Sequence, residues 1–252
     1  MALLRDVPFS RFHSDPMVAR AAAELSHLSD FHGPKDPGGR VTPGTIFRGN
    51  AGGELVGPYL SQFLLMDIPY GSLTINQRQK TVEPGIDYLT DEESWLAVQN
   101  GSVDVPQDEF EPTRRYIRTM RDLGQYVHVD ALYEVYLNAA LILLGLNAPV
   151  DPGNPYVNSA TQIGFGTFGG PHILSLVTEV ATRALKAVWY QKWFVHLRLR
   201  PEAYGGLVHL VKSGKRSPGG LSAPRRCAEL RGGRGHQDEV RRIPHADGIP
   251  GG

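Results

Sequence analysis

The stretch that decides the fold is Trp189-Tyr190-Gln191-Lys192-Trp193-Phe194-Val195-His196-Leu197-Arg198-Leu199-Arg200-Pro201-Glu202, followed by Ala203-Tyr204-Gly205-Gly206. On a continuous helix, which turns by about 100° per residue, Lys192, His196 and Arg200 lie along one face. An ammonium and a planar guanidinium on one stripe can hold a tetrahedral oxyanion between them. The spacing alone favours a solvated basic face. However, three aromatic side chains crowd the cations, and solubility does not require them.

The same stretch resembles the first active-site motif of vanadium-dependent haloperoxidases, in the form found in bacterial and red-algal bromoperoxidase relatives. That motif runs Lys-Trp-x-Val-His-x-x-x-Arg-Pro-Glu, with Gly-Gly a few residues later. The matching residues here are Lys192, Trp193, Val195, His196, Arg200, Pro201, Glu202, Gly205 and Gly206. Upstream blocks also match, beginning at Arg48-Gly49-Asn50, Asp67-Ile68-Pro69 and Tyr126-Val127-His128. The resemblance covers roughly residues 8–211.

The resemblance implies a site that binds vanadate as cofactor and uses halide and hydrogen peroxide as reactants. Lys192 and Arg200 are then two of three cations that neutralise the oxyanion. Lys192 is also the candidate catalytic residue, because its charge-assisted hydrogen bond makes the activated peroxide more electrophilic toward halide. Trp189 occupies a position near the halide site, although a tryptophan of the core or of an interface is an equal alternative. His196 is interpreted as a packing or hydrogen-bonding residue, so no residue is assigned as a metal ligand.

Two later motifs implied by the resemblance are missing from the sequence. The first is Pro-Ser-Gly-His, and Ser-Gly-His occurs nowhere in the chain. The second places an arginine six residues before the histidine that bonds directly to vanadium. In the tail, Arg231 and His236 are five apart and Arg241 and His245 four apart. We therefore expect a fragment, inactive as written and incomplete on its C-terminal side, with a truncation or frameshift near Ser213.

The apparent neutrality of the chain hides a difference between its two parts. Lys and Arg number 26 against 26 Asp and Glu, so the overall charge does not indicate a nucleic-acid partner. Residues 214–252 carry eight basic against four acidic side chains, nine glycines and no aromatic residue. This composition predicts a disordered or frameshifted tail after a partial haloperoxidase-like domain at 1–213. We expect no signal peptide, no membrane span and no disulfide within the chain, and the compartment stays open.

Apolar spacing predicts a mainly α-helical bundle. The family resemblance implies the type of helical fold that haloperoxidases share with phosphatidic-acid-phosphatase-type acid phosphatases. The expected helices are 17–28, 54–66, one from the acidic cap at 90–93 to Asn100-Gly101, 119–144 and 171–198. Three functions stay open: a vanadium-dependent haloperoxidase, an acid phosphatase with the same cationic pocket, and a non-catalytic remnant. A homo-oligomer is expected because apolar helix surface lacks packing partners.

Overall fold

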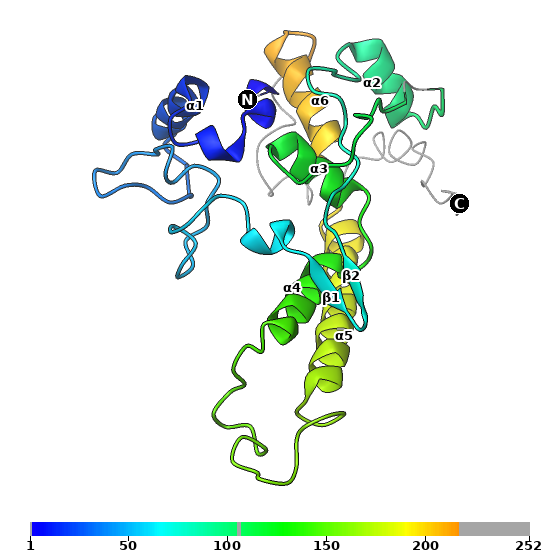
Figure 1. Cartoon of the computed structure of the whole chain (residues 1–252). Helices are drawn as coiled ribbons and strands as arrows, with labels where there is room; N and C mark the ends of the chain where they lie inside the picture. Colours follow the sequence, from blue (N-terminus) through cyan, green and yellow to red (C-terminus); the bar gives the residue numbers. More distant parts are fainter. Residues whose placement is uncertain (1, 105–106, 217–252) are drawn as a thin grey trace. The chain divides into compact units, whose positions relative to one another are not determined.

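The computed structural model describes residues 2–104 and 107–216, and the predicted tail therefore lies almost wholly outside the described residues. The described part is mainly helical, which confirms the predicted fold class. Its helices are α1 (Pro16–Ser26), α2 (Glu92–Gln99), α3 (Met120–His128), α4 (Glu134–Gly145), α5 (Gly170–Trp189) and α6 (Pro201–Lys212) (Figure 1). Short 3-10 turns cover Ala2–Asp6, Phe9–Arg11 and Gln62–Leu65, and a π-helical turn covers Tyr190–Val195. Within this described part, no helix is both long and apolar enough to cross a bilayer.

The chain divides into two compact units. The first contains residues 1–85 with 108–182, and the second contains 86–107 with the chain from residue 183 onward. Helix α5 therefore begins in the first unit and ends in the second.

The core of the first unit lies near the N-terminus. Phe12, Val18 and Ile46 are fully buried there. Asp15 accepts hydrogen bonds from the amides of Met17 and Val18, which caps α1 at its first turn. Helix α1 thus begins one residue before the predicted helix at 17–28 and ends two residues before its end.

The one sheet in the described residues is a hairpin of β1 (Ile68–Tyr70) and β2 (Leu73–Ile75). The strands are antiparallel, with Tyr70 opposite Leu73, and Gly71 adopts a positive φ of 61° in the turn. Helix α4 packs against β1 (Figure 1). A side chain at Gly145 would approach Cγ of Pro69 to 2.5 Å, so this contact requires glycine.

The predicted helix at 54–66 is wrong, except for the 3-10 turn at its end. The Arg48 guanidinium donates to the carbonyl of Glu54 at 3.0 Å and to that of Gly57 at 2.8 Å. Gly53 and Gly57 have positive φ, which a helix does not allow. The loop is therefore organised by one arginine that lies before it in sequence.

The predicted helix at 119–144 is two helices. Helix α3 begins with a capping box, in which Thr119 and Asp122 exchange hydrogen bonds with each other's backbone amides. It ends at His128, and α4 starts after Tyr133, which has a left-handed φ of 57°. The apolar spacing was correct on both sides of the break, but it gave no signal for the left-handed residue.

Candidate functional site

The end of α5 does not continue as the predicted helix to residue 198. Helix α5 ends at Trp189, and the next six residues form the π-helical turn. Leu197, two residues after the last residue of that turn, has a left-handed φ of 46°. A π turn contains more residues than an α turn, so it rotates the side chains out of the α-helical phase. The prediction that Lys192 and Arg200 share one helical stripe is therefore wrong.

Arg200 begins a second helix instead of ending the first. It is the N-cap of α6 and has extended dihedrals, φ −68° and ψ 154°. Pro201 explains this conformation, because a proline disfavours the helical region for the residue before it and suits the first helical position. The break thus places Lys192 and Arg200 on different elements of the second unit.

Both cations nevertheless act on one carboxylate. Arg200 Nε donates to Oε1 of Glu202, and Lys192 adds a favourable electrostatic interaction with the same group. Partial burial opposes ionisation of Glu202. Its own backbone amide, Arg200 and Lys192 outweigh that effect and lower the pKa of Glu202. Arg200 therefore pairs with Glu202 directly, and Lys192 attracts the same carboxylate only through longer-range electrostatics.

The aromatic residues of the stretch have different surroundings. The Lys192 Nζ lies 4.6 Å from the centre of the Trp193 ring, within cation–π range. Trp189 is 56% exposed, and no described contact joins it to Lys192 or Arg200. Its place near a halide site remains a prediction. His196 is exposed and its backbone amide donates to Gln191 O, and its interpretation as a packing or hydrogen-bonding residue stays a prediction.

A residue that the sequence did not indicate lies beside this site. Trp95, on α2, donates its indole N–H to the backbone carbonyl of Glu202 at 3.0 Å. Helix α2 is capped by Asp91, whose carboxylate accepts from the amide of Ser94. The predicted cap at 90–93 was thus correct in place, but its capping residue is Asp91. Trp95 was missed because 107 positions separate it from Glu202 and no local motif marks it.

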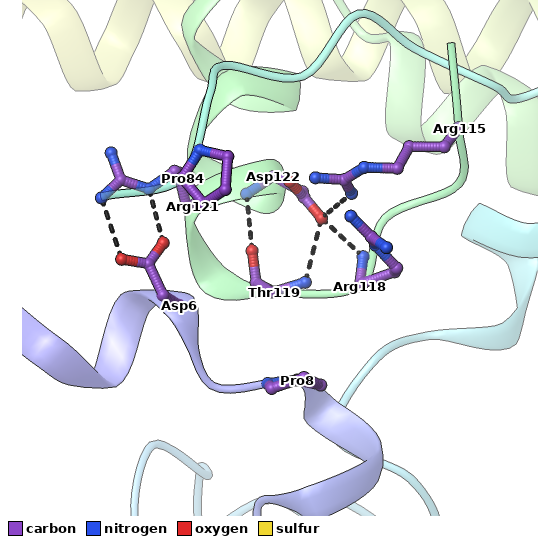
Figure 2. A pocket seen from close by; sticks show the side chains of 8 residues that line it. All are labelled: Asp6, Pro8, Pro84, Arg115, Arg118, Thr119, Arg121 and Asp122. Atoms are coloured by element: carbon purple, nitrogen blue, oxygen red, sulfur yellow. Dashed lines mark hydrogen bonds and ion pairs between the residues drawn. The ribbon is translucent and has the colours of Figure 1, made fainter. Parts of the chain in front are cut away.

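A separate cavity of about 240 Å³ lies in the first unit, between the N-terminal turn and the start of α3. Figure 2 shows Arg121 pairing with Asp6, and Asp122 accepting from Arg115 and from the backbone of Arg118. Arg115 also makes two hydrogen bonds to Glu111, at 2.7 and 2.6 Å. The three arginines at this cavity are matched by carboxylates. The arrangement is a structural ion-pair cluster and lacks the excess positive charge of an oxyanion site.

This cluster predicts that stability falls in acid. The hydrogen bond from Arg115 lowers the pKa of Glu111, and that from Arg121 lowers the pKa of Asp6. A carboxyl group whose folded pKa is depressed stabilises the protein above its ordinary pKa, and this contribution is lost as the pH falls through the folded value. We expect urea denaturation to give a smaller free energy of unfolding at about pH 3 than at about pH 6. Glu111→Gln should narrow this difference in the free energy of unfolding between the two pH values. An unchanged pH dependence in that variant would contradict a role for Glu111 in the acid sensitivity.

Known proteins resemble the chain in both sequence and fold. It is 42% identical to a vanadium-dependent bromoperoxidase of Corallina pilulifera in an alignment 254 positions long, which covers 84% of this chain and 42% of that protein. It is 35% identical to a vanadium-dependent bromoperoxidase of Ascophyllum nodosum, with 85% and 40% covered. The homohexameric structure of the second vanadate-dependent bromoperoxidase from Ascophyllum nodosum matches with a TM-score of 0.78 and 34% identity, covering 86% of this chain and 37% of that one. No protein-family model matches the chain.

Helical fold, cationic motif and shared sequence together define a chain of the vanadium haloperoxidase class. It belongs to the vanadium-dependent bromoperoxidase family. The chain spans about two fifths of the length of the curated relatives it matches.

Proposed function

We propose that this chain supplies Lys192 and Arg200 to the oxyanion site of a vanadium-dependent haloperoxidase, which oxidises halide with hydrogen peroxide. The observation that supports the proposal is the hydrogen bond from Arg200 Nε to the carboxylate of Glu202, to which Lys192 adds a weaker electrostatic attraction. A carboxylate there stands in for an oxyanion, because both present negatively charged oxygens to N–H donors. The relatives are all named bromoperoxidases, which favours this function over the acid phosphatase and the non-catalytic remnant.

The residues present fit vanadate. Lys192 offers three N–H donors on a flexible stem, and Arg200 offers a rigid fork. When bound, vanadate supplies the activation of hydrogen peroxide toward halide. Lys192 would donate a hydrogen bond to an oxygen of the bound group, and Arg200 would hold the oxyanion in place. In the part of the chain that the structure describes, no group of three or more His, Cys, Asp or Glu residues could hold a metal ion.

A homo-oligomer of the parent protein is part of the same proposal. The homohexameric structural relative supports it, and so do the exposed aromatic side chains Tyr190 and Phe194, which are 59% and 73% exposed.

Isothermal titration of vanadate tests the oxyanion site. We expect Lys192→Ala to weaken binding about tenfold, which is the scale of one hydrogen bond to a charged group. Lys186→Ala is the matched control, because it removes the same charge from an exposed position on α5 and should leave the affinity close to wild type. Equal losses in both variants would show a diffuse charge effect, and equal heats in all three proteins would exclude Lys192 from the site.

A further inference from the structure

The ring of Trp95 lies directly against α6. A Cβ atom added at Gly206 would lie 2.2 Å from Cε2 and Cζ2 of this ring and 2.8 Å from its Nε1. A rigid indole cannot move aside as a flexible side chain does, so the contact requires glycine at this position. Glycine is a poor helix former, and Gly206 is nevertheless in the middle of α6. The close approach of Trp95 gives the physical reason.

The neighbouring glycine provides a contrast. A Cβ atom added at Gly205 would meet nothing within 4 Å. The two glycines of the Gly-Gly pair therefore differ in their surroundings, although the sequence presents them as equivalent. Only Gly206 admits the tryptophan.

The polar edge of the Trp95 indole also binds the first turn of α6. Its indole N–H donates to the backbone carbonyl of Glu202, while the side chain of Glu202 accepts from Arg200. Helix α2 therefore fixes the backbone of the residue that pairs with the N-cap arginine. A second link, the ion pair between Glu92 and Lys215, joins the start of α2 to the chain beyond α6. Helices α2 and α6 lie side by side in the second unit (Figure 1).

We propose that Trp95 is a positioning residue for the oxyanion site: by contacting Gly206 and the Glu202 carbonyl, it fixes the start of α6 and so the direction of Arg200. This inference rests on the proposed function, because it assigns Trp95 to the same site. Trp95 acts through α6 and does not touch the oxyanion. Its effect on binding therefore depends on the orientation of Arg200.

Three variants separate this role from general stability. Trp95→Phe keeps an aromatic ring but removes the N–H donor, Gly206→Ala drives the ring away from α6, and Gly205→Ala is the matched control. The first readout is the NMR signal of the Arg200 Nε–H group, assigned by its loss in Arg200→Lys. The second is vanadate affinity by calorimetry. Far-UV circular dichroism tests whether each variant is folded. If Gly206→Ala does not fold, the result for Trp95→Phe is used by itself.

We expect Trp95→Phe and Gly206→Ala to shift the Arg200 signal and to weaken vanadate binding by about fivefold to tenfold, the scale of one neutral hydrogen bond. Gly205→Ala should leave both readouts unchanged. An unchanged Arg200 signal in Trp95→Phe overturns the inference, as does a shifted signal with unchanged vanadate affinity. If the wild-type chain binds no vanadate, the proposed function fails and the positioning of Arg200 is decided by the NMR signal alone.

Discussion

Replacing Asp122 with asparagine is expected to lower the free energy of unfolding by about 3 kcal/mol, the scale of a buried charge pair that loses one partner. Asp122 is fully buried. Its Oδ2 accepts from Arg115 Nη1 at 2.5 Å, from the Arg118 amide at 2.8 Å and from the Thr119 amide at 3.1 Å. Asparagine keeps the shape of the side chain but not its negative charge. The mostly buried guanidinium of Arg115 therefore loses part of the negative charge that balances it. The capping box of α3 is weakened by the same substitution.

Urea denaturation followed by circular dichroism measures this effect. The matched control is Asp91→Asn, because Asp91 is an exposed N-cap of α2 and asparagine is an equally good N-cap. We expect Asp91→Asn to change the free energy of unfolding very little. A loss at Asp122 no larger than that at Asp91 would contradict the structural role of the ion-pair cluster.

The second large expected effect is an absence of turnover. We expect the 252-residue chain by itself to brominate monochlorodimedone, with vanadate, bromide and peroxide present, no faster than vanadate without protein. The family resemblance implies a Ser-Gly-His group, a further arginine and a histidine ligand in addition to Lys192 and Arg200. Ser-Gly-His is missing from the sequence. Two cations alone leave the charge of the oxyanion under-compensated.

The control for this assay is Lys192→Ala, which should be as inactive as the wild-type chain. Turnover that rises with vanadate concentration in the wild-type chain and falls in Lys192→Ala would contradict the expectation. That result would show that this chain, alone or with a second copy of itself, supplies the missing groups.

The local geometry around Lys192 and Arg200 differs from the geometry that the sequence predicted. The family resemblance, not the spacing alone, predicted Lys192 and Arg200 as two cations at one oxyanion, and this role stays a prediction. In the structure, Arg200 pairs with Glu202, and Lys192 adds a weaker electrostatic attraction to the same carboxylate. The helical stripe was wrong, because α-helical periodicity cannot register a π turn or the left-handed Leu197. Pro201 did carry a usable signal, since a proline disfavours the helical conformation for the residue before it, here Arg200.

Local sequence patterns could not predict contacts between residues that are distant in the sequence. The helix predicted at 54–66 has the right apolar spacing, but Arg48 binds its carbonyls and Gly57 has a positive φ. Trp95 looked like an ordinary apolar residue of a short helix. Its partners, Glu202 and Gly206, are more than a hundred positions away. Such long-range hydrogen bonds have no periodicity that a sequence can show.

Vanadium-51 NMR tests the central claim, that Lys192 and Arg200 form an oxyanion site, most directly. Vanadate is titrated with the wild-type chain, with the double variant Lys192→Ala/Arg200→Ala, and with Lys186→Ala/Arg198→Ala, which has the same net charge. We predict that the wild type and the Lys186/Arg198 variant broaden the vanadate signal, that added salt reverses the broadening, and that the Lys192/Arg200 variant leaves the signal sharp. Equal line widths with both double variants would contradict the claim.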